Sequence, residues 1–444
     1  MGLARDMGVC QPLRSEPAVS WQYGGMYRST HQAHGMTRSD GLSQWQETVS
    51  RPMPHRSQPQ ASVLALWSFA MAPAPRCGIT GGGAAIAPPV GRAAATVRQR
   101  LREWRCETAR TAGTKRGVTR QALDVTTCFV PLLHWAPAWR SPTASRATRA
   151  MDARTSGQRC TVLAIRLIYR GCALPMVWVV LPAPPKGAWR SPWERRCTLI
   201  RPGAPTGWTV IVMADRGWYA QWLDRPIQAP GWRPLLRIKA GGTYRAEGAA
   251  AFRPPVQTVQ QGKAGWGGRA PCLSGPTSRL AGPLRARGDD DHTAPGLILT
   301  DRVPAPADGA WDGLRPIIAG GFKDVNRGGW HGEPTKMTDP ARAARLWLGS
   351  AVAALWVVRV GGCAEADGPA RMIAALPAAP GHSSQRTRPR LLRCFRRGVI
   401  VIVTPVITPG TLRAARCISE PWRKTLDPWA ALPSAQQPHQ EAAE

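Results

Sequence analysis

The spacing of apolar residues predicts a helix over residues 96 to 112. Val97, Leu101 and Trp104 recur at positions i, i+4 and i+7, which places them on one helical face. Thr96 opens a capping-box pattern at the start of this segment. The other positions carry four arginines, namely Arg98, Arg100, Arg102 and Arg105. We therefore expect a short basic amphipathic helix.

A second apolar segment predicts a helix over residues 340 to 360. Asp339 suits an N-cap position and Pro340 suits the first helical position. The core of the segment, Leu346 to Val358, has almost only apolar or small side chains. This stretch is shorter than the ~20 residues that a membrane span requires, and Arg359 interrupts it. A buried or interfacial helix is expected, with a membrane-spanning helix as the alternative.

Two shorter apolar runs are typical of strands. The run Val399 to Val403 consists of five β-branched residues, which favour strands. Val177 to Leu181 could also form a strand, but the apolar stretch around it, residues 161 to 185, is interrupted by charged residues and prolines. Among these interruptions are Arg166, Arg170, Pro175 and Pro182.

No other part of the chain keeps a helical or strand period, so the sequence predicts a mostly disordered or irregular chain with isolated α-helices and no globular fold. The expected organisation is an irregular segment (1–95), the basic amphipathic helix (96–112), an irregular segment rich in Pro, Gly, Trp and Arg (113–286), an acidic island (287–339), the apolar helix (340–360) and a basic irregular tail (361–444).

Composition supports the expectation of disorder. The chain has 444 residues and a net charge of +32, with 52 Arg against 7 Lys. Leu, Val, Ile and Phe together make up only 18% of the residues. A strongly charged chain with fewer than about 20% of such residues is expected to remain unfolded.

The same composition matches the codons of GC-rich DNA. Ala, Gly, Arg, Pro and Trp have GC-rich codons and are abundant, whereas Asn occurs once, at Asn326. The leading hypothesis is therefore that the sequence is translated from GC-rich DNA in a frame or on a strand that was not selected to encode protein, so that it has no evolved biochemical function.

Searches for catalytic and metal-binding motifs give no candidate. The chain has no Walker A motif, no HExxH motif and no SxxK motif. The two closest of the 11 cysteines, Cys160 and Cys172, are 12 residues apart, which does not fit the paired ligands of a structural zinc site. We expect no enzymatic activity, no catalytic or metal site, and no cofactor.

The charge suggests a first alternative function. Arginine attracts phosphate, and tryptophan stacks on unpaired bases, so the composition favours nonspecific binding of RNA or single-stranded DNA. Two arginine-rich segments would carry this binding. Their residues are Arg98, Arg100, Arg102, Trp104, Arg105, Arg386, Arg388, Arg390, Arg393, Arg396 and Arg397.

A second alternative is peripheral or single-span membrane association through residues 340 to 360, with flanking arginines at an anionic surface. No specific protein partner follows from the sequence. No signal peptide is recognised at Met1, and the expectation by default is a cytoplasmic protein.

Overall fold

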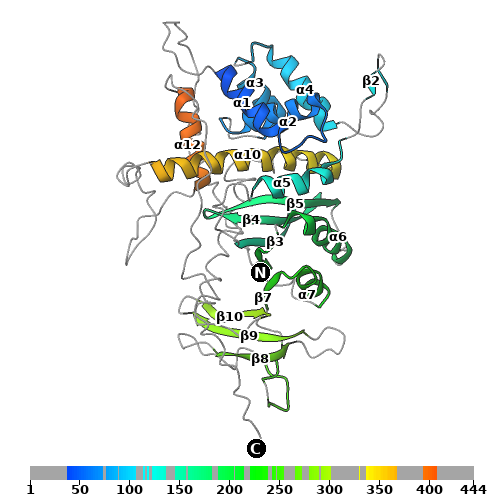
Figure 1. The fold of residues 1–444 in the computed structure, drawn as a ribbon, viewed down its shortest axis with the longest axis vertical. Helices are drawn as coiled ribbons and strands as arrows, with labels where there is room; N and C mark the ends of the chain where they lie inside the picture. Colours follow the sequence, from blue (N-terminus) through cyan, green and yellow to red (C-terminus); the bar gives the residue numbers. More distant parts are fainter. Residues whose placement is uncertain are drawn as a thin grey trace, which may run out of the picture. The chain divides into compact units, whose positions relative to one another are not determined.

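The computed structural model contains helices packed together and a large mixed sheet (Figure 1). It describes residues 38–73, 77–88, 90–106, 114–115, 118–119, 123–136, 146–156, 159–182, 189–204, 206–214, 221–238, 243–246, 248–254, 266–272, 280–289, 292–301, 330, 337–367 and 394–407. The chain divides into two units, Met1–Gly35 and Met36–Glu444. The following description concerns this second unit.

The first part of the unit is helical. Its elements are α1 (Arg38–Ser50), α2 (Gln58–Met71), α3 (Ile79–Ile86), α4 (Ala94–Cys106), the short strands β1 (Thr114–Lys115) and β2 (Val118–Thr119), the 3-10 turn η1 (Val125–Cys128) and α5 (Phe129–Trp135). Helix α2 contacts α1, α3 and α4. Because ten of the 14 residues of α2 are buried, this helix is the centre of the helical layer.

The sheet follows in the chain. It is built from β3 (Arg146–Ser156), β4 (Cys160–Tyr169), β5 (Cys172–Pro182), β6 (Thr209–Ala214), β7 (Arg233–Arg237), β8 (Trp266–Cys272), β9 (Leu280–Asp289) and β10 (His292–Thr300). The connections between strands hold α6 (Arg190–Ile200), η3 (Arg201–Gly203) and α7 (Gln221–Gln228). The eight strands lie in the order β5-β4-β3-β6-β7-β10-β9-β8. Strand β6 is parallel to β3 and β7, and the other neighbours are antiparallel.

Two helices from the later part of the chain complete the described fold, α10 (Pro340–Asp367) and α12 (Cys394–Ile407). Helix α10 contacts β5 on one side and α2 and α4 on another, so it lies between the sheet and the helical layer (Figure 1). The Trp178 indole on β5 donates to the Ala344 carbonyl of α10 over 3.1 Å. As the sequence predicts, Asp339 caps α10, because its carboxylate accepts from the Arg342 backbone N–H at 2.9 Å.

The apolar side chains of the central strands alternate between two clusters. On β6, Val210 and Val212 belong to the main core that α10 and the helices complete. Ile211 and Met213 point to the opposite face, where they join a smaller apolar cluster. The main core is continuous from α1 to α12. This buried core contradicts the expectation of a mostly disordered chain with isolated helices. Helices do form in the two expected regions, as α4 (Ala94–Cys106) and α10 (Pro340–Asp367), with residues 107–112 of the first outside the described residues, but both helices are packed against other elements.

The prolines and arginines that interrupt the 161–185 stretch are accommodated by the sheet. Pro175 lies on β5, an edge strand, opposite Arg166 at a register shift between β4 and β5. Proline is tolerated at edges and bulges because no ladder hydrogen bond is lost there. The buried Arg166 lies 5.5 Å from the centre of the Trp347 ring, and Arg170 lies in the turn between the strands.

The expected strand at Val399 to Val403 is wrong. These residues form part of helix α12, and strand propensity is overridden by packing. Cys394, Arg397, Gly398 and Ile402 recur at helical spacing and are buried. A helix is the conformation that places these four residues on one face.

Helix α10 is the described helix that is long and apolar enough to cross a membrane by length and composition. However, 89% of its most apolar window is buried inside the protein. Its apolar surface is therefore occupied by β5 and the helical layer. In this fold the helix is a core element.

Candidate nucleic-acid interface

Helix α4 is held by an apolar face. Val97, Leu101 and Trp104 are buried on this face, as their spacing predicts. The Trp104 ring packs edge-on against Trp67 at 5.5 Å between centroids. Its indole N–H donates to the Gln60 carbonyl at 3.2 Å. The helix is therefore fixed on the α2 side by both apolar packing and a buried hydrogen bond.

The arginines of α4 lie outside this apolar face. Arg98, Arg100 and Arg102 are exposed, and Arg105 is half-buried. Because 3.6 residues make a turn, Arg98, Arg102 and Arg105 share one flank of the helix and Arg100 lies on the other. Burial of α4 against the core therefore leaves the side chains of Arg98, Arg100 and Arg102 in solvent.

Acidic residues neutralise little of this charge. The helix contains one acid, Glu103, whose carboxylate accepts from the Gln99 side chain at 3.0 Å. Arg98, Arg100 and Arg102 form no ion pair with any residue that the structure describes. By contrast, Arg51, which directly follows α1, has Glu47 of α1 at 3.0 Å. Helix α4, which packs on α2 through Trp104, thus presents a net positive surface.

The last turn of α4 also contacts α10. Arg345 of α10 donates from Nη1 to the Arg105 carbonyl at 2.9 Å. Arg105 acts on the nearby Cys77 thiol as well. Burial raises the Cys77 pKa to about 12, while its backbone hydrogen bond and the charge of Arg105 oppose this rise.

The structure describes only part of the second arginine-rich segment. Four of its predicted binding residues lie outside the described residues, namely Arg386, Arg388, Arg390 and Arg393. Arg396 on α12 is exposed. Arg397, next to it, has only 7% of its side chain exposed and pairs with Glu365 at 3.3 Å. Of the two described arginines, Arg396 alone presents its side chain to solvent.

Most tryptophans in the described part of the chain are buried, and Trp189, Trp208 and Trp222 are half-buried against the core. Trp104 has 4% exposure, so its ring is unavailable to a base. Many of the other tryptophans are buried in the core in the same way. The buried set is Trp45, Trp67, Trp104, Trp135, Trp178, Trp193, Trp232, Trp330, Trp347 and Trp356. The expected stacking on unpaired bases is therefore not supported by these rings.

Sequence reasoning missed several charged residues of interest. Arg92, which is exposed, precedes α4 and adds to its positive charge; its position beside the predicted helix was the available signal. Arg170 and Glu365 form an ion pair at 2.8 Å although 195 positions separate them. No local sequence pattern reports a contact of that separation.

Within the described ranges, no three His, Cys, Asp or Glu side chains gather in a way that could hold a metal ion. The Cys128 thiol and the His55 imidazole lie near each other, with 3.9 Å between Sγ and Nε2. Burial raises the pKa of Cys128 and lowers that of His55. Both groups are therefore held neutral, which does not favour an activated thiolate.

Comparison with known proteins does not identify a family for this chain. No family model matches the sequence, and no curated protein matches it. A cryo-EM structure of a piggyBac transposase synaptic complex with hairpin DNA is similar over 84% of this chain and 80% of that chain, with a TM-score of 0.34 and 10% identity. This similarity is too low to support an argument. The finding that bears on function is the packed core with its eight-stranded sheet, which contradicts the hypothesis of an unselected translation product without a function.

Proposed function

We propose that the protein binds nucleic acid through the phosphate backbone, using the exposed arginines of α4. The observation that carries this proposal is the combination of solvent-exposed guanidinium groups at Arg98, Arg100 and Arg102 with a helix whose other face is buried. Guanidinium groups bind phosphate oxygens, and such contacts contribute affinity without sequence information.

The burial of the tryptophans changes the expected ligand. Base stacking favours single strands, whereas backbone electrostatics favour the higher charge density of a duplex. Since Trp104 is buried beneath the arginines, the proposed interaction is with the backbone and has no preference for unpaired bases.

The test is the salt dependence of binding to a duplex DNA of mixed sequence. The triple variant Arg98→Gln, Arg100→Gln and Arg102→Gln should reduce the magnitude of the slope of log K against log salt by about 2 to 3, because each phosphate contact contributes about 0.9. Affinity should fall similarly for unrelated sequences.

A matched control separates this surface from net charge alone. Arg51, Arg190 and Arg342 are exposed and lie beside Glu47, Glu194 and Asp339, respectively. Replacing these three arginines by glutamine removes the same formal charge. The control should leave the slope nearly unchanged. Equal effects of the two triple variants would contradict the assignment of binding to α4.

A further inference from the structure

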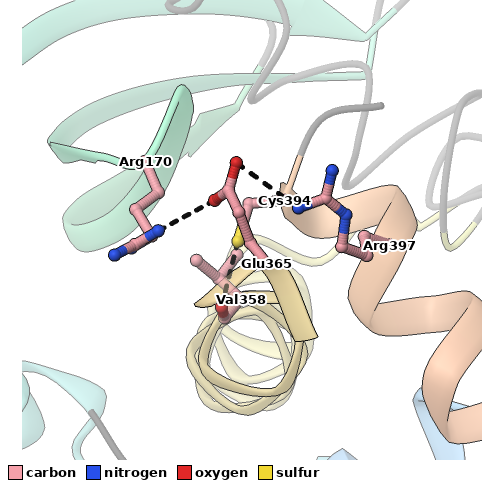
Figure 2. A network of polar contacts seen from close by, with 5 residues as sticks. All are labelled: Arg170, Val358, Glu365, Cys394 and Arg397. Atoms are coloured by element: carbon pink, nitrogen blue, oxygen red, sulfur yellow. Dashed lines mark hydrogen bonds and ion pairs between the residues drawn. The ribbon is translucent and has the colours of Figure 1, made fainter. Parts of the chain in front are cut away.

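The carboxylate of Glu365 lies between two arginines from distant parts of the chain. Its Oε2 is 2.8 Å from Nη1 of Arg170, in the turn between β4 and β5, and its Oε1 is 3.3 Å from Nη1 of Arg397 on α12 (Figure 2). One acid on α10 thus connects three elements. Neither the predicted nucleic-acid surface nor the core packing accounts for this arrangement.

Because Arg397 is buried, its charge depends on the Glu365 carboxylate for compensation. Only 7% of the Arg397 side chain is exposed, whereas 39% of Glu365 is exposed. A guanidinium buried in this way is costly without its counter-charge. Because Glu365 keeps contact with solvent, its interaction with the arginines is open to screening by salt.

Backbone packing places α12 directly on α10 beside this acid. A Cβ atom built on Gly361 would collide with the Cys394 carbonyl, and one on Gly398 would collide with the Val357 carbonyl. The Cys394 thiol donates to the Val358 carbonyl over 3.2 Å (Figure 2). These contacts exist only while the two helices remain in close approach.

We propose that Glu365 is an electrostatic latch that holds α12 on α10, and that loss of its negative charge or screening by salt releases α12. Release leaves Arg397 free to reach solvent and uncovers the glycine face of α10 at Gly361 and the Cys394 thiol. The fold then contains a helix whose docking is controlled by charge. This inference is independent of nucleic-acid binding.

The buried Cys394 thiol supplies a direct readout. Its alkylation rate in the full chain is measured by peptide mapping, with the partly exposed Cys106 at the end of α4 as internal reference. Glu365→Gln should accelerate labelling of Cys394 by about tenfold or more relative to Cys106, because opening of the local contact exposes the thiol. The control Glu47→Gln, which breaks an exposed ion pair on α1, should leave the ratio unchanged.

A double variant separates a latch from a general structural role. If the cost of Glu365→Gln arises from the uncompensated guanidinium of Arg397, then adding Arg397→Met should restore slow labelling of Cys394. Raising salt should accelerate labelling in the wild type and have little effect in the double variant. Fast labelling in the double variant, or slow labelling in Glu365→Gln, would overturn the proposal.

Discussion

Arg345 on α10 donates a hydrogen bond to the backbone carbonyl of Arg105 at the end of α4, with 2.9 Å between Nη1 and the oxygen. The last carbonyls of a helix have no partner within the helix, so a cation at this position satisfies one of them and interacts favourably with the helix dipole. The relationship joins the proposed binding helix to the central helix of the core.

Replacing Arg345 by methionine should therefore loosen the last turn of α4. Methionine retains apolar volume but leaves the Arg105 carbonyl without this donor, at an expected cost of about 1 to 3 kcal/mol. Hydrogen exchange of a peptide covering residues 101 to 106 measures the effect, and we expect faster exchange there with little change in β4. Unchanged exchange in this peptide would show that the hydrogen bond is not important for α4.

Trp356 of α10 lies between two aromatic rings of the helical layer. Its ring centroid is 5.1 Å from that of Trp45 on α1 and 4.9 Å from that of Phe69 on α2. Trp356→Ala should lower the free energy of unfolding by about 3 to 5 kcal/mol because it leaves a large cavity. Urea denaturation measures this loss, and Trp356→Phe should cost less. A cost below 1 kcal/mol for the alanine variant would contradict the packing described.

Three buried thiols predict loss of stability at alkaline pH. Burial raises the pKa of Cys77, Cys197 and Cys272 from 9.0 to about 12. Their contribution is fully present below pH 9, because folded and unfolded states are then equally protonated. Above pH 9 the unfolded chain loses these protons first, so the free energy of unfolding should fall by at most roughly 4 kcal/mol per pH unit until about pH 12.

Denaturant titrations between pH 8 and pH 11 test the thiol prediction. A variant with alanine at all three positions should have a flatter dependence over this range, even if its stability at pH 8 is lower. The same steep decline in the variant would assign the pH dependence to other groups.

The turn between β4 and β5 depends on two residues with positive φ, Arg170 at 46° and Gly171 at 70°. This pattern fits a two-residue hairpin turn. A Cβ on Gly171 would meet no atom within 4 Å, so the cost of Gly171→Ala is conformational alone. We expect a loss of about 1 kcal/mol in thermal or urea unfolding. A neutral or stabilising effect would argue against this turn geometry.

The periodic part of the fold could be predicted from sequence. Val97, Leu101 and Trp104 define the buried face of α4 by spacing alone, and Asp339 marks the start of α10. These predictions depend on residues within one or two turns. The exposed arginines of α4 follow from the same pattern, since positions outside an apolar face remain in solvent.

The sheet could not be predicted because its irregularities are resolved by distant elements. Arg166 is charged yet fully buried in β4, beside the Trp347 ring of α10. Pro175 is acceptable only because β5 is at the edge and the register shifts opposite it. The local sequence predicts that Arg166 and Pro175 interrupt a strand, whereas in the folded chain both lie within paired strands.

Composition was misleading for a related reason. Low contents of Leu, Val, Ile and Phe predict too small a core, but tryptophan and alanine occupy many further buried positions. Several buried indole N–H groups find acceptors, as Trp330 does at the Met71 carbonyl over 2.8 Å. The pairing of Glu365 with Arg170 and Arg397 depends on the same long-range folding.

The most direct test of the account is hydrogen exchange of the full chain in the peptides that cover β4 and β5, residues 160 to 182. If the chain folds around α10 and the sheet as described, these amides should exchange at least about 10³-fold more slowly than in the unfolded chain. Exchange of the same amides at unprotected rates would contradict the folded core and, with it, the placement of α4 and α12.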